Sequence, residues 1–288
     1  MLKPQVTHFF DEETGSLSYI VVDPASNACA IIDPVLGFDP VAARTVHHTT
    51  DRIIDFIQRQ HLHVHWILDT HVHADHVSAA AYLHEKLGGQ MGIGSRVTEV
   101  QKTFAGFFHL DGGFSCDGRQ FQRLFEDGEH FRIGNLDAQV IHTPGHTPAC
   151  VCYLIGDALF VGDTLFMPDL GTARCDFPGG DAATLYDSIQ RIYQLPDDTR
   201  IYVCHDYPGD GREHYCFETS VLEQKSLNQH LRAETAQDEF VTVRETRDKT
   251  LDLPRLMLPA VQLNIRGGRL PESEENGVSY LKIPLNRF

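Results

Sequence analysis

The stretch Asp69-Thr70-His71-Val72-His73-Ala74-Asp75-His76 places four potential metal ligands within six positions. It follows the run Val64-His65-Trp66-Ile67-Leu68, whose β-branched and aromatic residues predict a buried strand that ends at Asp69. The helix-forming residues 77–83 come next and predict a helix that begins near Asp75 and His76. A lone His-x-His usually belongs to a histidine-rich surface loop, but this spacing on a strand-to-helix turn indicates a metal site.

The composition is that of a folded protein with a substantial core, since 42% of the 288 residues are hydrophobic. Acidic residues outnumber basic ones by 40 to 24, which gives a net charge of −16 with histidine neutral. This excess disfavours binding to nucleic acid or to an anionic membrane, because both need basic patches. A small-molecule substrate is expected instead, and an anionic substrate would need local positive charge.

Localisation and cysteine usage point to a reducing compartment. The segment 1–8 has no apolar leader core, and no run approaches 18 uninterrupted apolar residues, so a cytoplasmic protein is expected. The seven cysteines are odd in number and form no Cys-x-x-Cys pair, which disfavours a disulfide framework and a zinc ribbon. Cys175 and Cys204 could be redox-active, although a buried, reduced role is the favoured interpretation.

Short strands and helices recur in two strand-rich halves of the chain. The first half predicts a hairpin from residues 17–23 and 28–33, a helix around Ile53 and Ile57, and a strand near 91–93. The second half predicts strands at 129–133, 137–141, 150–155, 158–161 and 200–204, and helices near 181–194 and 216–232. Two such halves with flanking helices predict an α/β fold, an αββα sandwich of two mixed sheets with helices outside.

The remaining segments set the expected domain organisation. Residues 95–126 show no sustained hydrophobic period and are interpreted as a long loop or insertion that could line a substrate entrance. The proline-containing tail after residue 250 is interpreted as a wrapping segment. The sequence therefore predicts one domain over residues 1–250, with that insertion, and a C-terminal segment, 251–288, that wraps the same domain.

Further candidate ligands each follow an apolar strand of the second half: His146, Asp163 and His205. In layered α/β folds the loops at strand ends gather at one edge, where sites form. All the candidates are therefore expected to meet at one edge of the sandwich. Together they are His71, His73, Asp75, His76, His146, Asp163 and His205.

The order and the residues of these motifs resemble those of the metallo-β-lactamase superfamily over most of the chain. The resemblance implies the αββα fold and a metal-activated chemistry of oxygen, but it does not specify which reaction is catalysed. The matching segments are Thr70 to His76, Thr143-Pro144-Gly145-His146-Thr147, Gly162-Asp163 and Cys204-His205-Asp206-Tyr207.

The residues beyond Asp163 resemble the persulfide dioxygenase branch of this superfamily. That branch has an arginine followed two residues later by Asp-Phe, as in Arg174-Cys175-Asp176-Phe177. Enzymes of the glyoxalase II type carry Cys-Gly-Arg/Lys-Phe-Phe-Glu-Gly in this region, and that pattern is absent here. The segment 262–267 also resembles the dioxygenase C-terminus, except that Gly267 stands where the mitochondrial enzymes have a cysteine. The long 95–126 region resembles the bacterial subtype called β-lactamase hydrolase-like.

The resemblance implies one Fe(II) per chain held by His71, His146 and Asp163. Two histidines and one carboxylate form a facial triad that leaves open positions for oxygen chemistry. The other four candidates would then orient the ligands and nearby waters, or could instead complete a site for two zinc ions. These four residues are His73, Asp75, His76 and His205.

On this resemblance the reaction is the oxidation of glutathione persulfide by O2 and water to sulfite and glutathione, a step of sulfide detoxification. The glutathione carboxylates need cations, for which Arg174 is the first candidate and Arg266 the second. Tyr207 is the candidate hydroxyl donor near the metal. Surface ion pairs for the arginines and core packing for the tyrosine are the alternatives. A homodimer is expected from the resemblance alone.

Two other functions stay open. One is a dinuclear zinc hydrolase of the glyoxalase II type acting on a glutathione thioester, and the other is a sulfur-carrier or regulatory module that binds a persulfide or a metal without turnover. The segment Arg174 to Phe177 favours the dioxygenase over the hydrolase, and the complete ligand set disfavours a binding module.

Overall fold

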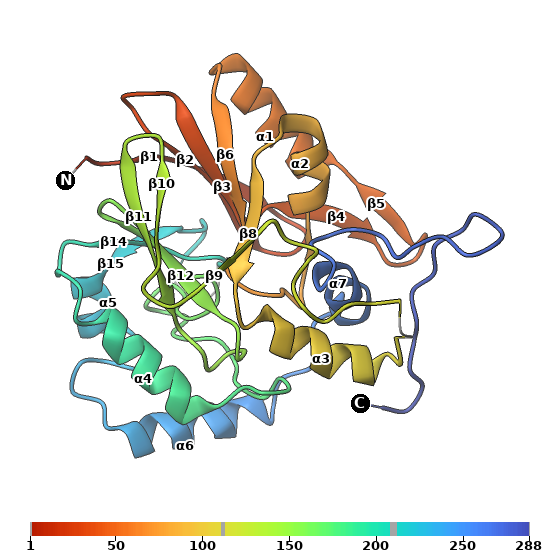
Figure 1. Ribbon diagram of the computed structural model, residues 1–288. Coiled ribbons are helices and arrows are strands. Elements are labelled where there is room, and N and C mark those ends of the chain that lie inside the picture. The colour runs from red at the N-terminus through yellow and green to blue at the C-terminus, as the bar shows by residue number, and fades with distance from the viewer. Residues whose placement is uncertain (1, 111–112, 208–211, 288) are drawn as a thin grey trace.

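The computed structural model describes residues 2–110, 113–207 and 212–287. Two six-stranded sheets pack against each other, and a three-stranded sheet of order β5-β4-β7 lies beside them (Figure 1). The first sheet has the order β1 (Gln5–Asp11), β2 (Ser16–Val22), β3 (Ala28–Ile32), β6 (His63–Leu68), β8 (Gln90–Gly94), β9 (Arg123–Phe125). The second sheet has the order β10 (His130–Ile133), β11 (Leu136–His142), β12 (Val151–Ile155), β13 (Ala158–Phe160), β14 (Arg200–Tyr202), β15 (Glu218–Ser220). The small sheet consists of β4 (Val35–Asp39), β5 (Arg44–Val46) and β7 (Val77–Ser78).

Helices cover both outer faces of the paired sheets, which confirms the predicted αββα sandwich. Figure 1 shows α1, α2, α3 and α7 on one side and α4, α5 and α6 on the other. Their bounds are α1 (His48–Arg59), α2 (Ala80–Leu87), α3 (Val97–Phe107), α4 (Ala182–Ile192), α5 (Val221–Leu227), α6 (Gln237–Asp248) and α7 (Met257–Asn264).

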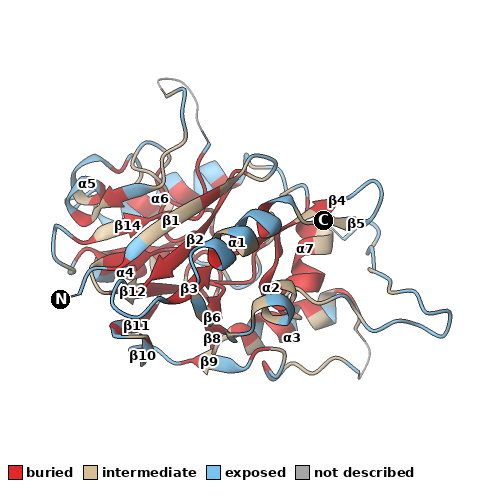
Figure 2. Ribbon diagram, turned by 90° about the horizontal axis from the view of Figure 1, so that it is seen from above, coloured by how far each residue is buried: buried red, intermediate tan, exposed pale blue. Residues whose placement is uncertain are grey.

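Alternation along the strands builds the two parts of the core. On β2, Leu17, Tyr19 and Val21 point into the space between the sheets, where they meet residues of the second sheet. The intervening Ile20 and Val22 pack on the other face with α1, α2, α3 and α7. Successive side chains of a strand point to opposite faces, so a strand covered on both sides is apolar throughout. Figure 2 accordingly shows buried strands and, on helices such as α1, an exposed outer face.

Strand direction brings the ends of several strands to one edge. In the first sheet β3, β6, β8 and β9 run parallel, whereas β1 and β2 pair antiparallel with their neighbours. In the second sheet β11 and β13 both pair antiparallel with β12, and β14 is parallel to β13. The carboxyl ends of β11, β13 and β14 therefore point the same way. The loops after these three strands carry His146, Asp163 and His205.

The expectation of a long loop over 95–126 was wrong for two parts of that segment. Helix α3 occupies Val97–Phe107, and β9 adds a parallel strand at Arg123–Phe125. The buried positions of α3 have the helical spacing 97, 100, 101 and 104, but position 101 is a glutamine. Its amide donates to Gln120 and to the carbonyl oxygen of Ile265, so it is satisfied although buried. A buried polar residue interrupted the apolar pattern from which the helix could have been recognised.

Two predicted helices begin later than expected. Residues 77–78 form β7, which pairs with β4, and α2 begins only at Ala80. The segment predicted as helical over 216–232 contains β15 and then α5, which ends at Leu227. In both cases the short strand is specified by its partner strand, which lies elsewhere in the chain.

The C-terminal segment begins with a buried helix that was not predicted. The side chains of Val261, Leu263 and Ile265, at and just beyond α7, are buried on the helix-covered side of the first sheet. Pro259 suggested an irregular tail, but it is the third residue of the helix, where no intrahelical N–H donor is needed. Beyond α7 the chain continues as an extended arm (Figure 1).

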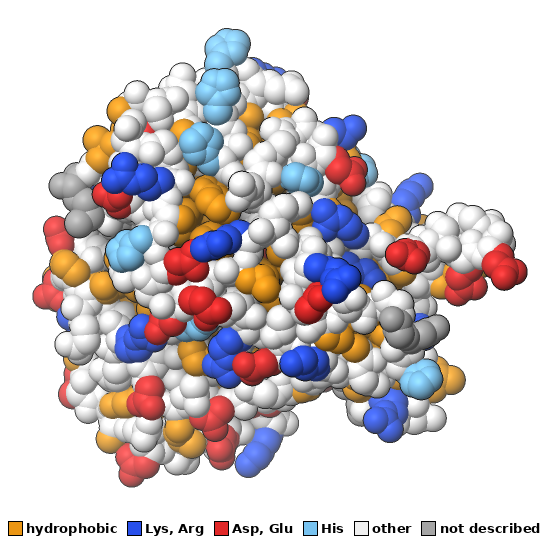
Figure 3. All heavy atoms as spheres, viewed as in Figure 1, with side chains coloured by type: hydrophobic (Ala, Val, Ile, Leu, Met, Phe, Trp, Pro, Cys, Tyr) orange, Lys and Arg blue, Asp and Glu red, His pale blue; other side chains and the backbone are white. Residues whose placement is uncertain are grey.

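Acidic and basic side chains are interspersed over the face drawn in Figure 3. No helix in the described part of the chain combines the length and apolar character needed to cross a bilayer.

Candidate metal centre and adjoining cavity

All seven predicted ligands meet at one edge of the sandwich. Asp163 lies between the two halves of the cluster: its Oδ2 is 3.8 Å from Nε2 of His71 and 3.6 Å from Nε2 of His146, and its Oδ1 is 3.4 Å from Nε2 of His205. The ligand atoms form two groups within which every pair lies within 4.8 Å. The first group is His71, His146 and Asp163, and the second is His73, Asp75, His76 and His205.

The donor atoms in this cluster fit a bound cation. Several of them are buried without a hydrogen-bond partner, and such orphaned polar atoms are costly in a protein interior. They are Nε2 of His71, Nδ1 of His73, Nε2 of His76, Nε2 of His205 and Oδ1 of Asp163. Imidazole nitrogens and a carboxylate suit zinc or iron, so the residues present can hold either metal.

The other ring nitrogen of each histidine is held by the surrounding protein. Thr70 Oγ1 lies 3.1 Å from Nδ1 of His71, and Asp33 Oδ1 lies 3.0 Å from Nε2 of His73. The Nδ1 atom of His146 donates to the backbone carbonyl oxygen of Arg174 at 2.7 Å. Such contacts select the tautomer and the ring orientation, which leaves the opposite nitrogen to face the centre.

The second group is joined by further contacts of the same kind. Nδ1 of His76 lies 3.1 Å from Asp75 Oδ2, and Nε2 of His205 lies 3.2 Å from the same oxygen. Nδ1 of His205 has Ser16 Oγ at 3.4 Å and the Tyr207 hydroxyl at 3.3 Å. Each ring is thus oriented before any ion binds, which reduces the entropy lost on binding.

At His71, His73 and Asp75 electrostatics favour the protonation states that metal ligands need, whereas at His76 burial is outweighed by the charge of Asp75, which raises the pKa of that ring. Burial, together with the neighbouring histidines, holds the pKa values of His71 and His73 well below the ordinary value, so both rings are neutral near neutral pH. Burial alone would raise the pKa of Asp75, but His205 and His76 outweigh it and hold that pKa well below its usual range. Neutral imidazoles and an ionised carboxylate are the forms that bind a metal.

Local backbone geometry explains why a glycine precedes His146. Gly145 has a φ of 139°, and a Cβ at this position would collide with the backbone of Leu185 in α4. The turn that carries His146 is therefore packed directly on α4, which only a residue without a side chain permits. The motif Thr143-Pro144-Gly145-His146 is a packing requirement as well as a ligand motif.

Sequence reasoning missed two residues that hold the metal loop, the segment 69–76 that carries four of the candidate ligands. Asp33 follows β3, is buried, and accepts hydrogen bonds from Thr70 as well as contacting His73. Asn264, at the end of α7, donates from Nδ2 to the carbonyl oxygens of His73 and His76, both at 2.8 Å. The signal for Asp33 was a polar residue directly after a buried strand. The contacts of Asn264 span 188 and 191 residues and have no local signal.

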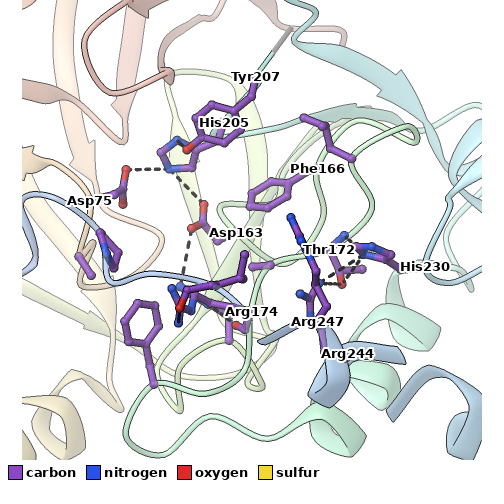
Figure 4. Close-up of a pocket in the computed structure, with 17 residues that line it drawn as sticks. Asp75, Asp163, Phe166, Thr172, Arg174, His205, Tyr207, His230, Arg244 and Arg247 are labelled. Atoms are coloured by element: carbon purple, nitrogen blue, oxygen red, sulfur yellow. Dashed lines mark hydrogen bonds and ion pairs between the residues drawn. The ribbon is translucent and has the colours of Figure 1, made fainter. Parts of the chain in front are cut away.

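A cavity of about 350 Å³ opens beside the centre. One side of it is formed by the candidate ligands Asp75, Asp163 and His205 (Figure 4). Another side carries polar residues that the sequence did not single out, and Phe166 and Leu170 contribute apolar wall. This polar side consists of Thr172, His230, Arg244 and Arg247.

The structure places the three predicted substrate residues differently. Tyr207 lines the cavity, and its hydroxyl lies near His205. Arg174 also lines it, but its guanidinium donates to both carboxylate oxygens of Asp176, at 2.6 and 2.7 Å, and to the carbonyl oxygen of Asp252. Arg266 is not among the residues that line this cavity, and its guanidinium stacks 4.6 Å from the ring centre of Phe114.

Both cysteines named as redox candidates are buried. Burial raises the pKa of the Cys175 thiol and that of the Cys204 thiol well above the ordinary value. The reactive form of cysteine is the thiolate, so both thiols are inert near neutral pH. This agrees with the interpretation of these residues as buried and reduced.

Comparison with known proteins gives the following matches. The family model described as Metallo-beta-lactamase superfamily matches residues 12–205. The Beta-lactamase hydrolase-like protein of Agrobacterium fabrum is 52% identical over 98% of this chain, which spans 65% of that protein, less than two thirds of its length. Glyoxylase B2 of Dictyostelium discoideum is 46% identical over 99% of this chain and 98% of its own length.

More distant relatives include proteins named for persulfide chemistry. The human mitochondrial protein named Persulfide dioxygenase ETHE1 is 30% identical over 90% of this chain and 87% of its own length. Among solved structures, ETHE1 from Myxococcus xanthus is 31% identical, covers 92% of this chain and 100% of its own, and has a TM-score of 0.73.

Proposed function

The chain belongs to the metallo-β-lactamase superfamily, and on that premise we propose that it is an iron-dependent persulfide dioxygenase acting on glutathione persulfide. The observation that carries the proposal is the contact between the segment Arg174-Cys175-Asp176-Phe177 and His146. The residues that resemble the dioxygenase branch are thereby joined to a proposed ligand of the metal. The human and Myxococcus relatives support the same choice.

In this proposal one Fe(II) would be held by Nε2 of His71, Nε2 of His146 and a carboxylate oxygen of Asp163. When bound there, iron would supply the redox chemistry that the activation of O2 requires. The overall reaction is balanced: glutathione persulfide, O2 and water give glutathione, sulfite and two protons. The outer sulfur is oxidised, O2 is reduced, and the sulfur–sulfur bond is broken.

The residues around the centre have roles that their positions support. Asp75 and His205 lie 3.2 Å apart at the edge of the cavity and would hold the water that supplies the third oxygen of sulfite. The Tyr207 hydroxyl, 3.3 Å from Nδ1 of His205, would hold that ring and could donate to the substrate. Phe166 and Phe177 line the cavity and would exclude further water from the reacting sulfur.

A second candidate function has its own support. The second group of ligands is complete, so the site could hold two zinc ions and hydrolyse a glutathione thioester by the glyoxalase II route. The similarity to the Dictyostelium protein named Glyoxylase B2 favours this alternative. Its four additional ligands are His73, Asp75, His76 and His205.

Metal content and substrate choice separate the two candidates. The protein is purified with little exposure to oxygen, its iron and zinc are measured, and it is then supplied with glutathione persulfide or S-lactoylglutathione. About one iron per chain, with oxygen uptake and sulfite formation from the persulfide, is the expected result. Two zinc ions with rapid thioester hydrolysis and no oxygen uptake would replace the dioxygenase by the hydrolase. A homodimer in the cytoplasm completes the proposal, and light scattering and cell fractionation would test both points.

A further inference from the structure

We infer that Arg247, on the last turn of α6, binds a carboxylate of the substrate. This inference rests on the proposed function for the identity of the substrate, but its geometric basis does not depend on the reaction. The cavity beside the metal centre contains three arginines: Arg174, Arg244 and Arg247. Their existing partners decide which of them is available to an anionic ligand.

Two of the three arginines are already paired. Arg174 forms a two-pronged ion pair with Asp176, and its side chain is only 12% exposed. Arg244 is 3% exposed and pairs with Asp248, one turn away on α6, at 2.8 Å. Its remaining guanidinium nitrogen donates to the carbonyl oxygen of Thr172 at 2.9 Å. To reach Arg244, a substrate carboxylate would have to break a buried pair, which is costly. To reach Arg174, it would have to displace Asp176 from a two-pronged, partly exposed pair.

Arg247 differs from Arg174 and Arg244 in the partners of its guanidinium. Within residues 2–110, 113–207 and 212–287, no carboxylate lies within 4.0 Å of its guanidinium. Its side chain has a single long contact, 3.5 Å to Thr250 Oγ1, and the residue is exposed while lining the cavity. A guanidinium presents a planar set of donors that matches a carboxylate, and this one is open to a ligand.

The neighbours of Arg247 keep its surroundings free of a competing charge. His230 accepts a hydrogen bond on Nδ1 from the Thr172 backbone at 3.0 Å, so its ring is held in one tautomer. Burial, with the charges of Arg244 and Arg247, lowers the pKa of His230 to about 4, and the ring is neutral near neutral pH. The charge of Arg244 is balanced by Asp248. Arg247 is thus left as the unbalanced cation on this side of the cavity.

The cavity therefore has two distinct ends. Asp75, Asp163 and His205 form the metal end, whereas Arg247 lies with Thr172, His230 and Arg244 on another side (Figure 4). A substrate with a reactive sulfur and a separate carboxylate could contact both ends of the cavity at once. The cavity volume of about 350 Å³ is at the lower end of the range typical of small-molecule sites. Anchoring the carboxylate away from the metal would orient the sulfur toward it.

The test measures binding, so that it does not depend on turnover. Calorimetric titration with glutathione is carried out on the metal-loaded protein, on Arg247→Ala and on Lys249→Ala. The Lys249→Ala substitution removes a positive charge at the end of the same helix, and Lys249 does not line the cavity. Arg247→Ala should weaken binding about tenfold, as expected for one charge-assisted hydrogen bond at a partly exposed site. Lys249→Ala should bind as the parent protein does, and Arg247→Lys should recover part of the loss.

Two modified ligands distinguish a direct contact from an indirect effect. One is the glycine monoethyl ester of glutathione and the other is cysteinylglycine, so each lacks one of the two carboxylates. If Arg247 contacts a carboxylate, the difference between the parent protein and Arg247→Ala must disappear with one of these ligands. A difference that persists with both, or equal binding of glutathione to the two proteins, overturns the inference. If the persulfide drives no oxygen uptake but the binding pattern holds, the proposed function fails while the anion site stands.

Discussion

The Nδ1 atom of His146 lies 2.7 Å from the backbone carbonyl oxygen of Arg174. The side chain of Arg174 is itself fixed by Asp176 and by the carbonyl oxygen of Asp252. The segment that resembles the dioxygenase branch therefore reaches the candidate metal centre through its backbone, and its charged side chains hold that backbone in position. This arrangement lets a change at Arg174 alter the metal site without any contact with substrate.

The first prediction concerns the Arg174–Asp176 pair. Asp176→Asn weakens the two-pronged contact and lets the Arg174 carbonyl shift, so metal affinity should fall about tenfold, as is typical when a contact that orients a ligand is lost. Chelator competition followed by metal analysis measures this. If Arg174 instead binds substrate, as the sequence predicted, Arg174→Ala would raise KM at unchanged metal content. In Arg174→Ala, a fall in metal content would therefore support the positioning role, whereas a raised KM at unchanged metal content would support the substrate-binding role.

The second prediction is that Asp163→Ala removes the metal more completely than any single histidine change. Asp163 is the carboxylate of the first group, and its second oxygen lies 3.4 Å from His205. Without this anion the charge of Fe(II) is poorly compensated, and metal content should fall at least tenfold. Elemental analysis of protein purified under low oxygen is the measurement, with the exposed Asp198→Ala as control.

A companion variant tests how many ions the site holds. His73→Ala should retain most of the iron but lose part of the activity, because the proposed iron ligands are untouched. Nδ1 of His73 is buried without a hydrogen-bond partner, so it is available to a second ion. Loss of metal equal to that of Asp163→Ala would mean that His73 is itself a ligand, and would favour a dinuclear centre.

The third prediction concerns Asn264, which joins α7 to the metal loop. Asn264→Ala leaves the buried carbonyl oxygens of His73 and His76 without a donor, at a cost of about 1–3 kcal/mol in the free energy of unfolding. Asn264→Asp has the same shape but places an acceptor against two acceptors, so it should be at least as harmful. Urea unfolding measures both. As a control, Asn276→Ala at an exposed position should leave the free energy of unfolding unchanged. Parent-like stability of Asn264→Asp would contradict a stabilising role for the two hydrogen bonds from Asn264 Nδ2.

The fourth prediction is a pH dependence of stability that originates at His230. Its pKa is lowered from 6.5 to about 4 in the folded protein, so between these values the unfolded chain binds more protons. This contribution to stability is complete above pH 6.5 and is lost as the pH falls toward 4. His230→Asn keeps an acceptor for the Thr172 backbone but does not titrate. The slope of unfolding free energy against pH should therefore be shallower in the variant over this window, and equal slopes would refute the assignment.

Much of the architecture could be predicted because it is encoded by local periodicity. The apolar runs of β2 and of β6 before Asp69 both specify strands, and strand–helix alternation then specifies the layers. Strand β2 is buried throughout, whereas β6, predicted as a buried strand, is buried only at Ile67 and Leu68. The errors fell where a long-range partner replaces the local signal. In α3 the buried Gln101 is satisfied by Gln120 and Ile265, and in β7 the pairing partner is β4.

The sequence by itself determined the set of candidate ligands. Metal-binding residue types at short spacing after strand ends are visible in the chain, and strand direction then brings them to one edge. Only the tertiary structure decided the availability of each side chain. Arg174 and Arg247 have the same guanidinium, yet Arg174 is paired with Asp176 and Arg247 has no such partner among the described residues. Asn264 likewise acquires its role from carbonyls up to 191 residues away. Such pairings depend on three-dimensional proximity, which chain spacing does not specify, and they decide which groups remain free to bind a ligand.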